Sequence, residues 1–187
     1  MGKLTIERDN KSYLFEEIIS EAELCQRIKE LGQQISIDYK GKVPIIIGVL
    51  NGSFLFMADL IRNLNIEFEV DFIKISSYGN DLKTSGSVSL IKDISANITG
   101  RDIIVVEDIV DSGLSVKYLY KKLSNNSPKS INVITCLKKK TKKDIDQLIK
   151  YIGFNISSSF VIGYGLDFEQ KYRGLNSIYN LKSHTES

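Results

Sequence analysis

An apolar run, a pair of carboxylates and a loop of small residues follow one another directly between Ile103 and Ser115. The run itself, Ile-Ile-Val-Val, has the composition of a strand that is buried on both faces of a parallel sheet. Glu107 and Asp108 come next, and the loop Asp-Ser-Gly-Leu-Ser then leads into residues 116–123, whose amphipathic pattern predicts a helix. The chain is therefore expected to contain a buried strand that ends in an acidic edge, a short loop and a helix N-terminus, in this order.

The loop at residues 111–115 has the features of a phosphate-binding site. Its backbone N–H groups and the hydroxyls of Ser112 and Ser115, together with the positive end of the following helix, favour an anion. The carboxylates of Glu107 and Asp108 suit the hydroxyls of a ribose, or a hydrated Mg²⁺ that also takes oxygens from a substrate phosphate. The alternative is a buried strand with a solvated acidic turn. The acidic pair and the Ser-Gly-Leu-Ser loop together favour a site for a sugar phosphate.

Composition limits the classes of protein to which the chain can belong. Of the 187 residues, 42% are hydrophobic and 26% are charged, and the net charge of +2 does not favour nucleic acid as a partner. The apolar runs are too short for a membrane span, and the N-terminus lacks a signal-peptide pattern. Cys25 and Cys136 fit no metal or redox spacing and are expected to be reduced, partly buried thiols. We expect a cytoplasmic protein with a single domain over residues 1–187 and no membrane or nucleic-acid partner.

Strands and helices alternate along the chain. Ser20 and Glu23 form a capping box, and the helix that follows is expected to end before Gly41. A second helix is predicted at 54–64. Strands are predicted at 43–50, 66–76, 88–91, 103–106, 131–137, 160–164 and 177–181. Residues 77–87 are small and polar and predict a mobile loop, whereas 142–151 are compatible with a helix or an irregular segment. The alternation indicates an α/β fold with a mainly parallel sheet, whose ligands bind beyond the carboxyl ends of the strands.

Several separated motifs resemble those of the type I phosphoribosyltransferases, in particular the bacterial hypoxanthine-guanine phosphoribosyltransferases. In chain order they are Val-Leu-Asn-Gly-Ser-Phe at 49–54 with Met-Ala-Asp-Leu at 57–60, Ser-Ser-Tyr at 76–78, the acidic segment and loop at 107–115, Leu-Lys-Lys at 137–139, and Phe-Val-Ile-Gly-Tyr-Gly-Leu-Asp at 160–167 followed by Tyr-Arg-Gly-Leu at 172–175. The resemblance implies a mainly parallel central sheet flanked by helices, with a small hood and a flexible lid loop.

The resemblance also implies an activity in purine salvage. The 5-phosphoribosyl group of 5-phosphoribosyl-1-pyrophosphate (PRPP) would pass to N9 of hypoxanthine or guanine, which gives IMP or GMP and pyrophosphate. Mg²⁺ is the implied cofactor, and a homodimer or homotetramer is the implied assembly. PRPP and the purine base would be the small-molecule partners.

Roles for individual residues follow from their positions in the family's motifs. Asp111 would be the general base or acid at N7 of the purine. The implied PRPP contacts are Asn51, Gly52, Glu107, Asp108, Asp111, Ser112, Gly113, Leu114, Ser115 and Arg173. The implied purine contacts are Ile109, Lys139, Phe160, Val161 and Asp167. Glu107, Asp108 and Asp167 would hold metal, and Ser77 and Tyr78 would belong to the lid.

Two residues depart from a simple match to the family. The family usually has a lysine where this chain has Asn51, so any charge from that side chain is in doubt. Lys139 lies in a lysine-rich run, which is usually a solvated face, so the purine-reading lysine could instead be Lys138 or Lys140. A PRPP-binding regulator with the same fold and no turnover is the alternative function. A Mg²⁺-dependent phosphohydrolase is a third, but it leaves Lys139 and Phe160 without a role.

Overall fold

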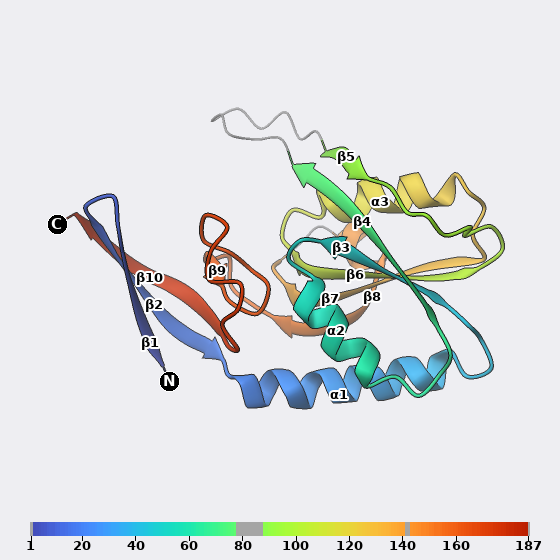
Figure 1. The fold of residues 1–187 in the computed structure, drawn as a ribbon, viewed down its shortest axis with the longest axis horizontal. Coiled ribbons are helices and arrows are strands. Elements are labelled where there is room, and N and C mark those ends of the chain that lie inside the picture. Colours follow the sequence, from blue (N-terminus) through green and yellow to red (C-terminus); the bar gives the residue numbers. More distant parts are fainter. Residues whose placement is uncertain (1, 78–87, 141–142, 187) are drawn as a thin grey trace.

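The computed structural model describes residues 2–77, 88–140 and 143–186 and is built on a six-stranded sheet. The strand order is β5-β4-β3-β6-β7-β8, and every neighbouring pair is parallel except β4 with β5 (Figure 1). The strands are β3 (Ile45–Leu50), β4 (Glu69–Ser77), β5 (Val88–Lys92), β6 (Asp102–Val110), β7 (Ser130–Lys138) and β8 (Ile149–Asn155). The predicted α/β fold with a mainly parallel sheet is confirmed.

Helices cover both faces of this sheet. On one face, α1 (Glu21–Asp38) and α2 (Phe54–Arg62) pack with alternate β6 residues such as Ile104 and Val106. On the other face, α3 (Leu114–Ser124) and α4 (Lys143–Asp146) pack with Ile103 and Val105. Because both faces are buried, the central strands are continuous apolar runs rather than alternating ones.

A second, four-stranded antiparallel sheet forms the hood, in the order β1-β2-β10-β9 (Figure 1). Its strands are β1 (Lys3–Arg8), β2 (Lys11–Ile19), β9 (Val161–Ile162) and β10 (Ile178–Glu186). The N-terminal hairpin was not predicted. Its signal was the apolar alternation on either side of Asp9 and Asn10, which turn the chain with φ values of 47° and 59°. Positive φ at consecutive Asp or Asn residues is typical of a tight hairpin turn.

Helix α1 begins as its capping box predicts. The Ser20 hydroxyl accepts a hydrogen bond from the Glu23 N–H, and the Glu23 carboxylate accepts one from the Ser20 N–H at 2.9 Å. The predicted partial burial of both thiols is wrong for Cys25, which is exposed because it lies beside the buried stripe of α1. Cys136 is buried within β7.

Several boundaries differ from those predicted. Strand β6 continues through Glu107 and Asp108 to Val110, because the equally long β7 pairs with it as far as Lys138. Helix α3 begins at Leu114, inside the predicted loop. The undecided segment contains α4 and the first residues of β8, whereas β9 is shorter and β10 longer than expected. Among the described residues, no helix combines the length and apolar character needed to cross a bilayer.

Strands β3 and β6 are neighbours at the point where the direction of winding changes. From β3 the chain passes to β4 on one side, and from β6 it passes to β7 and β8 on the other. Ligands of such sheets bind at this switch point, and we call the region between the loops that follow β3 and β6 the crevice. Residues 51–53 and 111–113 flank this crevice.

Asp71 of β4 is predicted to stabilise the connection that leads from β5 to β6. Its carboxylate, with a side chain 11% exposed, accepts hydrogen bonds from the N–H groups of Phe72, Ser95 and Ala96 at 2.7, 2.6 and 2.8 Å. Burial raises the pKa of Asp71, but these hydrogen bonds outweigh it, so the pKa lies below the usual value. Asp71→Asn should lower the free energy of unfolding at pH 7 by about 1–3 kcal/mol in urea titrations.

The pH dependence of this loss has a defined sign. A carboxyl with a lowered pKa in the folded protein stabilises it above the unfolded pKa, and this contribution disappears as the pH falls. The difference between the parent and Asp71→Asn should therefore shrink below about pH 4. Asp9→Asn, at a side chain 84% exposed, is the matched control and should change stability by less than about 0.5 kcal/mol. A difference that is constant with pH would contradict this account.

Candidate functional site

The loop after β3 lies directly against the acidic part of β6. A Cβ atom on Gly52 would come 1.5 Å from a carboxylate oxygen of Asp108, so only glycine fits there. The preceding Leu50–Asn51 peptide bond is cis, and Asn51 is exposed. Ser53 is fully buried and its hydroxyl donates to the Val49 carbonyl at 2.7 Å. The predicted site residues Gly52 and Asp108 are thus in contact across the crevice.

A third segment, residues 163–175, packs against the loop that carries Gly52. Gly165 has a φ of +98°, and a Cβ atom there would come 2.0 Å from the Gly52 carbonyl oxygen. The Arg173 guanidinium donates to the Gly165 carbonyl at 2.8 Å and pairs with Asp167 at 2.8 Å. The structure therefore brings Arg173 and Asp167 to the loop that carries Gly52.

Glu107 and Asp108 are consecutive residues of a strand, so their side chains point to opposite faces of the sheet. Burial, and secondarily the charge of Asp108, raise the pKa of Glu107 well above its usual value, and one of its carboxylate oxygens is buried without a hydrogen-bond partner among the described residues. Burial raises the pKa of Asp108 to about 6, although the hydrogen bond from the Ile109 N–H and the charge of Arg173 lower it. Both carboxyls are poised to accept donors or a cation from a ligand.

The predicted phosphate loop leads directly into α3. Gly113 is the N-cap of this helix with a φ of +76°, and a Cβ atom there would come 2.7 Å from side-chain carbons of Ile145 in α4. Asp111 and Ser112 are exposed, and the first turn of α3 contains no acidic residue. The Leu114 N–H donates to the exposed Ser112 hydroxyl at 3.4 Å, and the N–H groups of the first turn have no acceptor within the helix, so this N-terminus favours an anion.

The lysine run contains two paired members. Lys139 forms an ion pair with Asp111 at 2.8 Å, and Lys138 forms one with Asp146 of α4 at 2.8 Å; each lysine side chain is only 12% exposed. The expectation of a solvated lysine face is wrong for both, whereas Lys140 is exposed. Asp111 and Lys139, predicted separately as site residues, are therefore direct partners.

The remaining predicted site residues are more dispersed. Phe160 is 46% exposed and contacts Phe168 edge-on at a centroid distance of 5.9 Å. Val161 is buried in β9, where it pairs with Asn180, and Ile109 is half-buried in β6. Ser77 is the last residue of β4, and Tyr78, with the rest of the predicted lid, lies outside the described residues. Among the described residues no three acidic, His or Cys side chains converge on one point, so Glu107, Asp108 and Asp167 do not form a metal cage by themselves.

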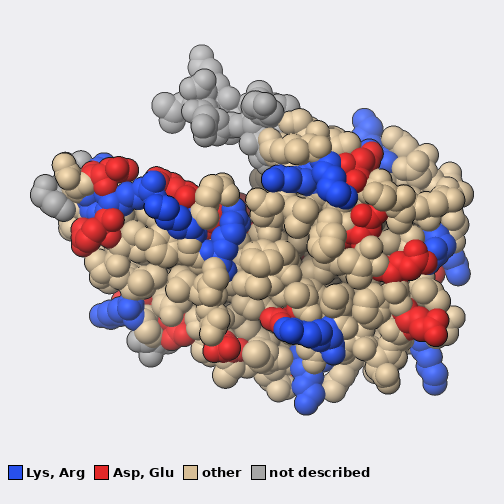
Figure 2. Space-filling model, in the orientation of Figure 1, with Lys and Arg blue, Asp and Glu red and all other residues tan. Residues whose placement is uncertain are grey.

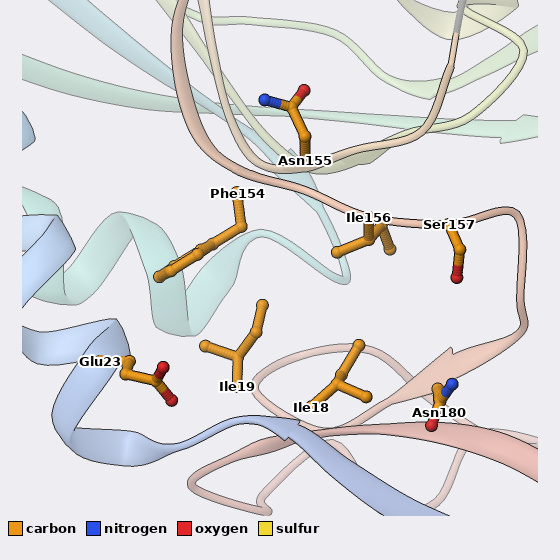
Figure 3. A pocket seen from close by; sticks show the side chains of 8 residues that line it. All are labelled: Ile18, Ile19, Glu23, Phe154, Asn155, Ile156, Ser157 and Asn180. Carbon is orange, nitrogen blue, oxygen red and sulfur yellow. The ribbon is translucent and has the colours of Figure 1, made fainter.

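A separate pocket of about 320 Å³ lies at the junction of the hood and the core (Figure 3). Ile18 and Ile19 of β2, Phe154 of β8 and Asn180 of β10 contribute to its wall. No predicted site residue lines it. The face of the molecule in Figure 2 carries acidic and basic side chains close to one another rather than in single-sign blocks. The crevice between β3 and β6 thus remains the candidate site.

The parallel sheet, the glycine-dependent crevice at its winding switch and the loop at a helix N-terminus together define an α/β protein that binds a phosphorylated sugar or nucleotide. The chain belongs to the phosphoribosyl transferase domain family, whose model matches residues 16–169. This confirms the resemblance inferred from the motifs.

Relatives of known name cover most of the chain. It is 42% identical over 165 residues to the hypoxanthine-guanine phosphoribosyltransferase of Bacillus subtilis (strain 168), across 88% of this chain and 92% of the relative. It is 43% identical over 162 residues to the hypoxanthine phosphoribosyltransferase of Escherichia coli (strain K12), across 86% and 91%. A crystal structure of a hypoxanthine-guanine phosphoribosyltransferase from Bacillus anthracis has a TM-score of 0.81 and 42% identity, and the match covers 89% of this chain and 98% of that one.

Sequence reasoning assigned no role to two residues that join the site's loops. The Tyr164 hydroxyl donates a hydrogen bond to Asp59 of α2 at 2.5 Å, and Asp59 also pairs with Arg62. Both residues lie within the motifs that carry the family resemblance. The signal that could have drawn attention to Tyr164 was a large residue between Gly163 and Gly165, where the chain has left-handed geometry.

The close approach of Gly165 to Gly52 predicts a large effect of one added methyl group. Gly165→Ala would place Cβ against a backbone carbonyl at a φ that alanine rarely adopts. It should lower the free energy of unfolding by about 2 kcal/mol or more, measured by urea unfolding. Gly174→Ala, where a Cβ would meet nothing within 4 Å, is the control and should change stability by less than about 0.5 kcal/mol. Equal effects at the two positions would contradict the contact.

Proposed function

We propose that this protein transfers the 5-phosphoribosyl group of PRPP to N9 of hypoxanthine or guanine and releases pyrophosphate. The observation that carries the proposal is the ion pair of Lys139 with Asp111, 2.8 Å long, at the first residue of the loop that leads into α3. A 6-oxopurine at this pair would present O6 and N7 to one ammonium and one carboxylate. The names of the relatives at 42–43% identity agree with this substrate class.

The crevice has separate positions for the parts of PRPP. The 5′-phosphate would accept hydrogen bonds from the N–H groups at the start of α3. Gly113 would let the backbone come close to the phosphate, and Ser112, Leu114 and Ser115 would be its other contacts. The ribose hydroxyls would donate to Asp108 and to Glu107, one of whose buried oxygens lacks a partner among the described residues. Pyrophosphate would lie between the Asn51–Gly52 peptide and Arg173.

The purine would lie between the core and the hood. Phe160, nearly half-exposed beside Phe168, would stack on the base, Ile109 would cover its other face, and the Val161 backbone would meet its edge. Lys139 would donate to O6. Asp111 would share the proton at N7 as N9 attacks C1 of the ribose, so the positive charge on the base is neutralised while the bond to pyrophosphate breaks. Tyr78 and Ser77 would belong to the lid that excludes water.

The side chains at the crevice fit Mg²⁺ that is held jointly with substrate. A buried carboxylate oxygen of Glu107 lacks a partner among the described residues, and Asp108 lies within electrostatic reach of Asp167. Oxygen ligands of this kind suit Mg²⁺, which keeps several waters and takes only one or two carboxylates. Bound Mg²⁺ would neutralise charge on the leaving pyrophosphate. Asp167, which pairs with Arg173, would be one of its protein ligands.

A turnover assay tests the proposal directly. With PRPP, Mg²⁺ and hypoxanthine or guanine, the protein should form IMP or GMP and one equivalent of pyrophosphate, and excess EDTA should abolish turnover. A PRPP-binding regulator would bind PRPP without forming nucleotide, and a phosphohydrolase would release phosphate without consuming purine. Either of these results would refute the proposed transfer.

Asp111→Asn should lower kcat by about 10²–10⁴-fold, because a positioned acid or base contributes that much to proton transfer. The KM for PRPP should change far less, since the substituted amide keeps the size of the side chain and an acceptor oxygen for Lys139. Steady-state kinetics with both substrates measures the change in kcat separately from the change in KM. A variant with kcat within twofold of the parent would remove Asp111 from the chemistry.

Lys139→Ala should abolish the preference for 6-oxopurines. The ammonium is a donor only, so the amino group at C6 of adenine leaves it unpaired, and sites of this kind reject the mismatched analogue by about 10⁴–10⁵-fold. The variant should lose most kcat/KM for hypoxanthine, so that hypoxanthine and adenine converge. Lys140→Ala, at an exposed lysine, is the control and should keep the preference.

Lys138→Ala tests the alternative register. Because Lys138 pairs with Asp146, its loss should reduce stability while discrimination against adenine persists. Discrimination that is lost in Lys138→Ala but retained in Lys139→Ala would assign purine recognition to Lys138.

We also propose that the core and the hood fold as a single domain and that the protein assembles as a homodimer or homotetramer. Val161, Tyr164 and Ile178 of the hood region belong to the same buried cluster as α1 and α2, which supports one folding unit. Phe54 is 40% exposed at the start of α2, next to the candidate site, and is available for a subunit contact. Light scattering and a single unfolding transition test these two statements.

A further inference from the structure

Tyr164 occupies a backbone conformation that tyrosine rarely adopts. Its φ is +49°, between Gly163 at +95° and Gly165 at +98°, and its side chain is buried, with 8% of the residue exposed. A left-handed conformation is unfavourable for a residue that has a Cβ atom, so glycine would suit this backbone better. The side chain must therefore supply something that offsets this cost.

The phenol of Tyr164 connects the 163–175 segment to helix α2, which follows the Asn51–Gly52 loop. Its hydroxyl donates to the Asp59 carboxylate of α2 at 2.5 Å, and the same carboxylate pairs with Arg62 one turn later. Burial, and then Asp59, raise the pKa of Tyr164, so the phenol stays protonated and remains a donor. Helix α2 begins at Phe54, directly after the Asn51–Gly52 loop, and the buried Ser53 ties that loop to β3.

The backbone around Tyr164 also determines where Arg173 lies. The Tyr164 N–H donates to the Leu175 carbonyl and the Gly165 N–H donates to the Arg173 carbonyl, both at 2.8 Å. The Arg173 guanidinium returns a hydrogen bond to the Gly165 carbonyl at 2.8 Å. Any shift of Tyr164 relative to α2 is therefore passed to Arg173, whose guanidinium is bonded to Gly165 beside the Gly52 carbonyl.

We propose that Tyr164 is a positioning residue whose hydrogen bond to Asp59 sets the spacing between the Asn51–Gly52 loop and Arg173, and thereby the affinity for the pyrophosphate group. The inference rests on the proposed function, in which pyrophosphate lies between these two elements. The phenol touches neither substrate in this account. It acts by holding two binding loops at one distance.

Tyr164→Phe removes the hydroxyl and keeps the ring. The KM for PRPP should rise about ten- to a hundredfold, the scale of one hydrogen bond to a charged acceptor, while the KM for hypoxanthine changes less than about twofold. Binding of inorganic pyrophosphate with MgCl₂, measured by calorimetry without turnover, should weaken by a similar factor. Asp59→Asn keeps an acceptor oxygen for Tyr164 and should stay within about threefold of the parent, whereas Asp59→Ala should behave like Tyr164→Phe.

Tyr151→Phe is the matched control. Tyr151 is 2% exposed and its hydroxyl donates to Asp38 at 2.6 Å, the same kind of bond, but it joins β8 to the end of α1. Tyr151→Phe should lower the thermal stability about as much as Tyr164→Phe does and should leave the KM for PRPP unchanged. The inference would be overturned if Tyr164→Phe bound PRPP and pyrophosphate as well as Tyr151→Phe does. It would also be overturned if the KM values for PRPP and hypoxanthine rose by equal factors in Tyr164→Phe.

The proposed function and this inference fail in different ways. If the parent protein forms no nucleotide from PRPP and hypoxanthine, the function is refuted, and the pyrophosphate titration still reports whether Tyr164 sets the spacing. If the parent turns over and Tyr164→Phe matches Tyr151→Phe, only the positioning role is lost.

Discussion

Close backbone contact at the carboxyl edge of the sheet is the constraint on which the site depends. Gly52 accommodates the carboxylate of Asp108, and Gly165 accommodates the carbonyl of Gly52, at distances that leave no room for a side chain. Protein interiors are close-packed and adjust little, so these contacts hold segments far apart in the sequence at one spacing. Asp108, Asp167 and Arg173 are within mutual electrostatic reach for this reason.

The lysines at the end of β7 form two separate ion pairs near this contact. Lys138 and Lys139 are consecutive at the end of β7 but have different partners, since Lys138 pairs with Asp146 of α4 and Lys139 pairs with Asp111. The first pair holds α4, whose Ile145 packs beside Gly113 of the predicted phosphate loop. The second pair lies at the open end of the crevice. Of two neighbouring lysines, Lys138 therefore supports the loop and Lys139 lies at the candidate site.

Prediction from sequence succeeded where the signal was local. The capping box at Ser20 and Glu23 fixed the start of α1, and the apolar run before Glu107 identified a central strand. The predicted end of that strand was wrong, because pairing with β7 carries β6 past the acidic pair to Val110. Strand β8 was missed because Ile149–Asn155 has little apolar alternation, and it forms because an edge of β7 is available to pair with it.

The sequence by itself determined the fold class, because apolar periodicity and glycine-rich turns express preferences of the chain within a few residues. Its motifs also determined the family, and the family resemblance indicated most of the candidate site residues. Only the tertiary structure decided that Asp111 pairs with Lys139, that Glu107 and Asp108 face opposite sides of the sheet, and that Tyr164 reaches Asp59. Two of these relations join segments that are far apart in the sequence. All of them depend on strand register and on how closely two backbones can approach, which no local pattern specifies.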